Sequence, residues 1–429
     1  METSAPGFFG NSGNGRKWME GDELTMARKD CCSGYSENIS EYSEYIKEVI
    51  GQPISELETP ALMVDLDIME ANMEKMMAFL KKSGAGVGIR PHAKTHKTPQ
   101  IALAQMAKGA LGICCAKVGE AEAMAEGGLP DILIANQVVG HRKIKRLAAL
   151  SKKTNLKVAV DTKENLQDIS RESAKQGGKV GIVIEVEVGN KRGGVRTVEE
   201  AVEIAKLAST LPGVWYAGVM GYEGFAVFMP DFEARKAAAN GAYDILLSFR
   251  DAIEEKAGLD SEIVSAAGTG TFQFAGRRQG LTDIEAGSFI FMDVRYGDTA
   301  GVGFRHSLAV VATITSHPEP DLYICDAGLK SMSREFGIIS TLPSYGVKVS
   351  NMSEEHVSLR PSDNPHQLPG FKELNDKYAK PAKPLGIGDK VLLIPSHCCT
   401  TVNLHDIIYA VRNGKIEDVW KVTGRGRFV

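Results

Sequence analysis

The sequence predicts a (β/α)8 barrel of the TIM type followed by a second, mainly β domain. Short apolar runs recur from Thr59 onward, and each is followed by a helix-like stretch. Parallel strands that are buried on both faces and separated by helices fit a closed barrel better than an open doubly wound sheet. The eight runs are Ala61–Leu66, Val87–Arg90, Gly112–Ala116, Asp131–Ala135, Lys157–Val160, Gly181–Val188, Tyr216–Met220 and Glu262–Ala266.

The pattern changes after about Asp298, where strands follow one another without long helices between them. These strands are Ser307–Thr315, Leu322–Asp326, Lys390–Pro395 and Ile408–Val411. We therefore expect a barrel over residues 57–303 and a mainly β domain over residues 304–429. Residues 1–56 are rich in Gly, Ser, Asn and Glu, so we expect a flexible extension that can end in a short helix.

The stretch after the first run shows the helical pattern clearly. Asp67 and Glu70 stand at its start in the arrangement of a capping box. Apolar side chains then recur at spacings of three and four, which predicts a helix with one face packed in the core. They are Met69, Met73, Met76, Met77 and Leu80.

Composition narrows the possible partners. Acidic residues number 54 and basic residues 50, and no basic block suggests a nucleic-acid or membrane-surface patch. There is no run of about eighteen apolar residues and no apolar signal segment at the start, so we expect a cytosolic protein with a small-molecule partner. The seven cysteines include three adjacent pairs, which indicates reduced thiols, some able to bind metal, rather than a disulfide framework.

The second apolar run ends in the basic octapeptide Arg90–Lys97. Catalytic groups of such barrels follow the carboxyl ends of the strands, so this is a candidate site. The octapeptide can be a solvated loop, or it can be an anion site whose positive potential lowers the pKa of a lysine. A lysine activated in this way suits Schiff-base chemistry, because only the neutral amine attacks a carbonyl. The residues alone leave both interpretations open.

The octapeptide follows Thr59–Leu62 and a strand that ends in Asp65, and this combination resembles the D-threonine aldolase and D-serine dehydratase-like family. The resemblance extends from about residue 57 to residue 429. It implies a barrel of the alanine racemase type and pyridoxal phosphate held by Lys94 as a Schiff base.

The resemblance implies further contacts with the cofactor. Gly189–Val195 is similar to the turn of the family whose arginine, here Arg192, lies against the cofactor ring; alone, it could be a surface turn. Tyr222 matches a position near the cofactor, although a buried core tyrosine is an equal alternative. After the eighth run, Ala267–Thr271 can cradle a phosphate, and Glu285–Asp293 is a family-like segment that can complete the cradle. The residues expected in the cradle are Gly268, Thr269, Gly270, Gly287 and Ser288.

A second candidate site lies in the β domain, at His397 and Cys399. In an extended segment the two side chains project to the same side, as two ligands of one metal would, although a buried structural cysteine is the plainer alternative. The family places two metal ligands here. Cys399 favours zinc, with manganese or magnesium as alternatives. Neighbouring candidates for supporting roles are His356, His405 and Asp406.

The resemblance implies a lyase that acts on small D-3-hydroxy amino acids, in a homodimer. A metal at the β-hydroxyl can promote retro-aldol cleavage to glycine and an aldehyde, or it can stabilise departing hydroxide and lead to a keto acid and ammonia. Cys399 matches zinc-dependent D-serine dehydratases, whereas the aldolases usually carry aspartate there. We favour the aldolase because more positions agree with it. An amino-acid racemase and a non-catalytic pyridoxal-phosphate protein are less favoured alternatives.

Overall fold

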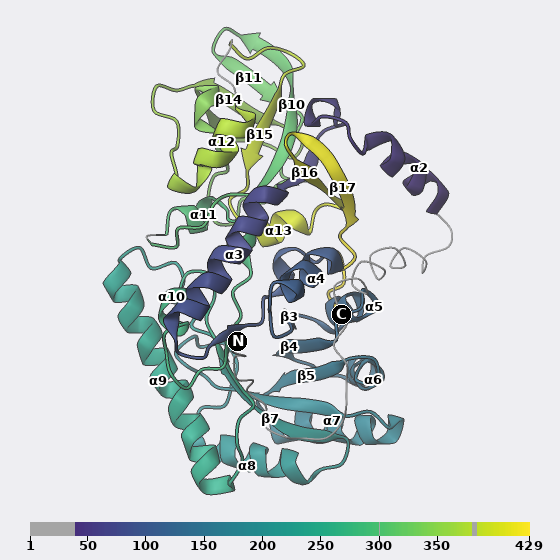
Figure 1. Cartoon of the computed structure of the whole chain (residues 1–429), viewed down its shortest axis with the longest axis vertical. Helices are drawn as coiled ribbons and strands as arrows, with labels where there is room; N and C mark the ends of the chain where they lie inside the picture. The colour runs from purple at the N-terminus through teal and green to yellow at the C-terminus, as the bar shows by residue number, and fades with distance from the viewer. Residues whose placement is uncertain (1–38, 300, 380–383) are drawn as a thin grey trace, which may run out of the picture.

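The computed structural model describes residues 39–299, 301–379 and 384–429. Two sheets make up the architecture, with the barrel in the lower half of Figure 1 and the mainly β domain above it. Residues 1–38 of the predicted flexible extension lie outside the described residues. The part of the extension that the structure describes contains the short helix α2 (Ile39–Val49) and a 3-10 turn, Ile54–Glu56.

Eight parallel strands form the barrel, in the order β2-β9-β8-β7-β6-β5-β4-β3. The first and last strands of this order meet through a parallel bridge between His92 and Cys114, and Leu111 N donates to Ile89 O over 2.9 Å. The predicted (β/α)8 barrel is therefore confirmed. Its strands are β2 (Gly88–Ile89), β3 (Ile113–Cys115), β4 (Asp131–Gln137), β5 (Asn155–Val160), β6 (Val180–Glu185), β7 (Val214–Gly221), β8 (Ile263–Ala266) and β9 (Asp283–Ile284).

Helices cover the outside of the barrel (Figure 1). Alternate residues of each strand face these helices, and they form one large core with the apolar faces of the helices, as Val158 and Ile182 do. The remaining strand residues, including Leu133 and Val183, form a separate cluster inside the barrel. The helices are α4 (Pro99–Ala107), α5 (Val118–Glu126), α6 (His141–Leu150), α7 (Lys163–Gln176), α8 (Val198–Thr210), α9 (Phe232–Ala257) and α10 (Phe272–Ala275).

One predicted strand belongs to the other sheet. The run Ala61–Leu66 forms β1 (Ala61–Asp65), which lies between β10 and β16 of the β domain. The assignment of this run to the barrel is therefore wrong. The predicted start of the barrel at residue 57 is wrong for the same reason. The missing barrel strand is β9. Its two residues are too few to produce a periodic apolar run. The second predicted run is therefore the first strand of the barrel in chain order, and each later run is likewise shifted by one place.

The second sheet has nine strands and confirms the mainly β domain. Its order is β13-β14-β11-β10-β1-β16-β17, and β15 pairs with both β10 and β12. The strands are β10 (Leu308–Glu319), β11 (Leu322–Cys325), β12 (Ser340–Thr341), β13 (Val347–Met352), β14 (Val357–Pro361), β15 (Lys390–Ile394), β16 (Ile407–Arg412) and β17 (Lys415–Lys421). Short helices α11 (Val294–Gly297), α12 (Lys372–Tyr378) and α13 (Cys398–Val402) accompany them.

Helix α3 (Leu66–Ser83) runs from the β domain to the barrel (Figure 1). Met69, Met73 and Met76 are buried in the large core, as the spacing predicted. The predicted capping box is wrong. Asp65 caps the helix instead, because its carboxylate accepts from Ile68 N over 2.9 Å. Asp67 and Glu70 form ion pairs on the surface, both of them with Arg412.

Two expectations drawn from composition concern the cysteines, expected as reduced thiols, and the absence of a long apolar run. The five cysteines in the described ranges are free thiols. Cys31 and Cys32 lie outside these ranges. Within the described part of the chain, no helix has both the length and the apolar character needed to cross a membrane.

The cap of α3 generates a stability prediction. Asp65 is fully buried and, besides capping the helix, accepts from Tyr378 Oη over 2.6 Å and pairs with Lys377 at 3.1 Å. Asp65→Ala should therefore lower the free energy of unfolding by about 3 kcal/mol in a urea titration. Glu74 lies on the same helix and forms an exposed ion pair with Lys108, which follows α4, so Glu74→Ala should cost at most about 1 kcal/mol. Equal losses in the two variants would contradict this account of the cap.

Candidate active site and metal centre

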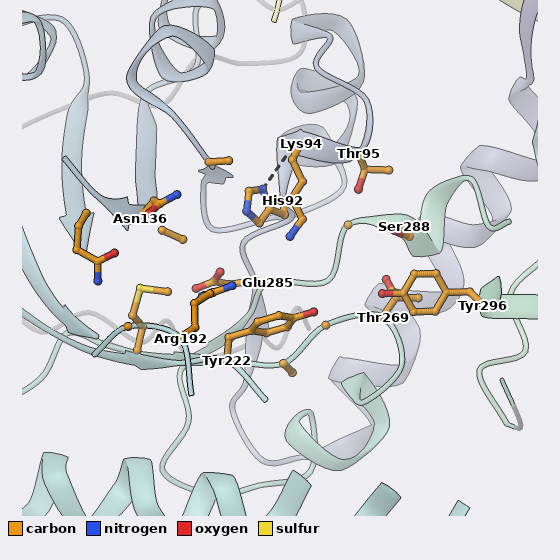
Figure 2. Close-up of a pocket in the computed structure, with 18 residues that line it drawn as sticks. His92, Lys94, Thr95, Asn136, Arg192, Tyr222, Thr269, Glu285, Ser288 and Tyr296 are labelled. Carbon is orange, nitrogen blue, oxygen red and sulfur yellow. Dashed lines mark hydrogen bonds between the residues drawn. The ribbon is translucent and has the colours of Figure 1, made fainter. Parts of the chain in front are cut away.

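A cavity of about 300 Å³ opens at the carboxyl ends of the barrel strands. This is the end at which barrels of this type carry their functional groups. Seven of the eight residues expected to bind the cofactor line the cavity, and the eighth, Gly270, does not (Figure 2). The seven are Lys94, Arg192, Tyr222, Gly268, Thr269, Gly287 and Ser288.

Lys94 lies in a short 3-10 turn, Ala93–Thr95, and projects into the cavity (Figure 2). Its backbone N–H donates to His92 Nδ1 over 3.3 Å, which fixes the turn. Burial of the amine away from water lowers the pKa of Lys94. Electrostatic interactions with Tyr222, Cys399, Cys114 and Glu285 raise it, and the net pKa is above its usual value.

The expectation that the basic octapeptide lowers the pKa of Lys94 is wrong, because the other basic side chains are neutral or paired elsewhere. Arg90 pairs with Asp283 at 3.1 Å and also with Asp131, at the wall of the barrel. Lys97 lies 3.7 Å from the buried carboxylate of Glu120. Burial lowers the pKa of His96 to about 4, so this imidazole carries no charge near neutral pH.

Arg192 and Tyr222 face Lys94 across the cavity (Figure 2). The Tyr222 ring lies near two cations, since Lys94 Nζ and the Arg192 guanidinium carbon are each 5.7 Å from its centroid. Arg192 is held by Glu185, whose Oε1 accepts from Arg192 Nη2 over 3.2 Å. The cavity therefore offers a lysine amine opposite an aromatic ring and a guanidinium that is hydrogen-bonded to Glu185.

The loops after β8 and β9 form one wall of the cavity. Thr269 Oγ1 accepts from Phe289 N over 3.1 Å and so joins the two loops. Only glycine fits at position 287, because a Cβ there would lie 2.4 Å from Thr95 Oγ1. Gly270 has a packing role instead, since a Cβ there would lie 1.9 Å from Val227 O.

The β domain brings its predicted metal ligands to the same place. The segment is not extended throughout, because His397 precedes helix α13, which begins at Cys398. Its ligand atoms are close together all the same, since those of His397, Cys398 and Cys399 all lie within 4.8 Å of one another. Cys399 Sγ lies 3.4 Å from Thr95 Oγ1 and 3.7 Å from Ser288 Oγ, both on residues of the cavity wall.

The charge states of His397 and Cys399 favour metal binding by the Cys399 thiol. A hydrogen bond from the Cys398 thiol, together with the nearby His397 and Lys94 cations, holds the pKa of Cys399 well below its usual range. The thiolate is the form that binds metals. Burial lowers the pKa of His397, but Cys399 and Asp293 outweigh it and raise the pKa to about 11. A metal ion would have to displace the proton of this imidazole.

The three predicted supporting residues do not reach the site. His356 is exposed at the turn between β13 and β14. Asp406 is exposed and pairs with Arg425 at 2.7 Å. His405 Nε2 hydrogen-bonds to Ser331 O over 2.8 Å and so holds the loop beside α13.

Sequence reasoning missed several polar residues of the site, among them His92, Glu285, Asp293 and Tyr296. His92, Glu285 and Tyr296 line the cavity, and Asp293 Oδ2 lies 2.8 Å from His397 Nδ1. Burial, with the charge of Asp283, raises the pKa of Glu285 to about 7. A signal was present for Glu285 and Asp293, because they are the two acidic residues of an otherwise mostly apolar segment, Glu285–Asp293.

Comparisons with known proteins agree with this architecture. Residues 64–294 match the model of the alanine racemase N-terminal domain, and residues 307–411 match that of a serine dehydratase domain. The chain is 36% identical over 412 residues to 3-hydroxy-D-aspartate aldolase of Paracoccus denitrificans (strain Pd 1222), covering 94% of this chain and 100% of that relative.

Solved structures extend the comparison. D-threonine aldolase from Filomicrobium marinum superposes with a TM-score of 0.81 at 33% identity, covering 89% of this chain and 98% of that one. D-threo-3-hydroxyaspartate dehydratase from Delftia sp. HT23 superposes with a TM-score of 0.72 at 26% identity, covering 86% and 98%. The chain belongs to the D-threonine aldolase and D-serine dehydratase-like family of pyridoxal-phosphate enzymes, which has the alanine racemase fold.

Proposed function

We propose that the protein is a pyridoxal-phosphate- and divalent-metal-dependent lyase that cleaves small D-3-hydroxy amino acids to glycine and an aldehyde. One observation carries the proposal: Cys399 of the metal-ligand pair contacts Thr95 and Ser288 in the wall of the cavity that holds Lys94. A substrate bound in this cavity can present its amino group to the cofactor and its β-hydroxyl to the metal. The names of the relatives at 33% and 36% identity support the choice of reaction.

The cavity fits pyridoxal phosphate in charge and in the kinds of group it offers. Lys94 supplies the amine for covalent attachment, and Arg192 supplies a guanidinium for the ring. Gly268, Thr269 and Ser288 supply hydroxyls and unencumbered backbone for the phosphate. The bound cofactor supplies an electron sink for the bond that breaks at the substrate Cα.

The donors at His397 and Cys399 fit a divalent metal ion. Two protein ligands leave coordination positions for water and for a substrate hydroxyl. A thiolate beside an imidazole suits zinc, whereas manganese or magnesium prefers oxygen ligands. The bound ion supplies a Lewis acid that lowers the pKa of the β-hydroxyl.

Two titratable residues of the cavity, His92 and Glu285, can accept or release a proton near the reacting atoms. Burial, together with the nearby Lys94 and Lys97, lowers the pKa of His92 well below its usual value, so its imidazole is neutral. Glu285, with a pKa of about 7, can hold or release a proton at its carboxyl near neutral pH. Both residues line the cavity, whose wall supplies the scaffold that orients the substrate.

The second candidate function is dehydration of D-serine or D-3-hydroxyaspartate to a keto acid and ammonia. Cys399 favours it, because a cysteine at this position matches the zinc-dependent D-serine dehydratases. Solved structures of D-threo-3-hydroxyaspartate dehydratase also include a histidine mutant and a cysteine mutant, the latter in a metal-free form. The cleavage reaction is preferred because the aldolase relative is more similar in sequence than the dehydratase relative, at 36% against 29% identity. A non-catalytic cofactor carrier would not need ligands from the β domain. The homodimer and the cytosolic location stay predictions.

Product analysis tests the proposed function. With D-threonine the purified protein should release glycine and acetaldehyde, because the metal-bound hydroxyl favours cleavage of the Cα–Cβ bond. Treatment with a chelator should abolish this activity and leave the visible absorbance of the cofactor in place, because metal and cofactor are held by different domains. Release of 2-oxobutanoate and ammonia without glycine would establish the dehydratase instead.

Covalent attachment at Lys94 can be tested with a matched pair of variants. Lys94→Arg should lose the visible absorbance and the peptide label left by borohydride reduction, since a guanidinium does not attack the cofactor carbonyl. Lys97→Arg makes the same change three residues away, where the side chain faces Glu120, and should keep both signals. Persistence of the label on this peptide in Lys94→Arg would refute the assignment.

The identity of the metal depends on Cys399. The wild type should bind zinc and keep it against excess magnesium, whereas Cys399→Asp should shift the preference toward manganese or magnesium. Metal analysis of the two proteins after dialysis against mixed ions measures the shift. Under the aldolase proposal, the variant still releases glycine from D-threonine when loaded with the harder ion. An unchanged metal preference would make Cys399 a structural thiol.

A further inference from the structure

We propose that Asp293 is the positioning residue of the metal centre, which holds the His397 imidazole in the tautomer that directs Nε2 at the ion. The inference rests on the proposed function in one respect, namely that His397 binds a metal. Asp293 itself is fully buried and belongs to the segment that leaves the barrel, whereas His397 belongs to the β domain.

In the described part of the chain, the Asp293 carboxylate accepts hydrogen bonds from three donors. Oδ2 accepts from His397 Nδ1 over 2.8 Å and from Cys398 N over 3.0 Å. Oδ1 accepts from Tyr296 N over 2.8 Å. The two backbone N–H groups cannot change their direction, so they hold the carboxylate with an oxygen toward Nδ1. The imidazole nitrogen facing it must therefore carry the hydrogen.

This hydrogen bond determines which nitrogen is free for a metal. A neutral imidazole has one N–H and one lone pair, and the partner of one nitrogen selects the tautomer. With the hydrogen on Nδ1, the lone pair lies on Nε2. Histidines that bind metals commonly donate their other nitrogen to a carboxylate or a carbonyl, and loss of that partner typically weakens metal binding about 10–100-fold.

The backbone around Asp293 is arranged to bring the carboxylate to this point. Met292, the preceding residue, has φ +54°, a conformation that side chains other than glycine rarely adopt. The next two residues hydrogen-bond across to the segment before His397, with Val294 N donating to Pro395 O over 3.1 Å and Arg295 N to Ser396 O over 3.3 Å. The position of Asp293 is therefore set by the same contacts that join the two domains.

The imidazole ring is also confined from the sides. Its centroid lies 4.9 Å from that of Phe336 in an edge-to-face arrangement and 6.1 Å from that of Tyr296. The aromatic rings limit rotation of the imidazole but cannot select between its two nitrogens. The selection requires a polar partner, and the structure supplies that partner in Asp293.

Asp293→Asn tests the proposal because it keeps the size of the side chain and replaces one acceptor oxygen with a donor. An amide cannot accept from the Tyr296 N–H on one side and from Nδ1 and the Cys398 N–H on the other. The cofactor-loaded variant should bind zinc 10–100-fold more weakly than the wild type in competition with a chromophoric chelator. Cobalt(II) in the site should show an altered visible ligand-field spectrum, and the cofactor absorbance should stay unchanged.

Asp298→Asn is the matched control. Asp298 also contacts a histidine, since its Oδ1 lies 3.2 Å from His366 Nε2, but both residues are exposed and outside the cavity and the donor group. This variant should bind zinc and cobalt(II) as the wild type does. Wild-type zinc affinity and an unchanged cobalt spectrum in Asp293→Asn would overturn the proposal.

A double-mutant cycle separates positioning from general stabilisation. If Asp293 acts through the imidazole, Asp293→Asn should change the residual zinc affinity less than twofold in a His397→Ala background. Equal weakening in both backgrounds would make the role merely structural and overturn the proposal. If Asp293→Asn fails to fold, Asp293→Ser, which leaves space for water, is used with the same expectations. Unchanged zinc binding in both His397→Ala and Cys399→Ala would contradict the proposed metal site itself.

Discussion

The functional site depends on one junction between the barrel and the β domain. Backbone hydrogen bonds join residues 294–295 to residues 395–396, and they hold the end of β15 against the segment that follows β9. Neither domain contains a complete site, because Lys94 belongs to the barrel and the proposed metal ligands His397 and Cys399 belong to the β domain. A shift of one residue in this register would move Cys399 away from Thr95, which it now approaches to 3.4 Å.

Backbone strain is concentrated around this junction and the cavity. Among the described residues, five that are not glycine have a positive φ, and four of these lie next to or within a few residues of a site residue. Lys97 follows the turn of Lys94, and Lys191, Ala267 and Met292 directly precede Arg192, Gly268 and Asp293. Each such conformation costs of the order of 1–3 kcal/mol and persists only where surrounding packing enforces it. The packed barrel therefore supports loops that a less stable scaffold could not hold in place.

The parts of the architecture that repeat along the chain could be predicted from the sequence. The barrel follows from alternating apolar runs and helices, and the family resemblance of the motif around Lys94 indicated a candidate cofactor lysine. The role of Asp293 could not be predicted in this way, because its partner His397 lies 104 positions away and only the folded junction brings them together. β1 resembled a barrel strand because burial on both faces gives the same apolar run in either sheet.

The place of β1 also determines how the molecule can be divided. This strand precedes the whole barrel in the chain, yet it lies inside the second sheet, between β10 and β16. The barrel is thus an insertion within the β domain, and no single cut separates the two. During synthesis on the ribosome, β1 has no neighbour until the barrel and then β10 have emerged, and it gains its second neighbour only when β16 has emerged. The half of the site that carries His397 and Cys399 is consequently the last to be assembled, and recombination between relatives must exchange β1 together with the C-terminal segment.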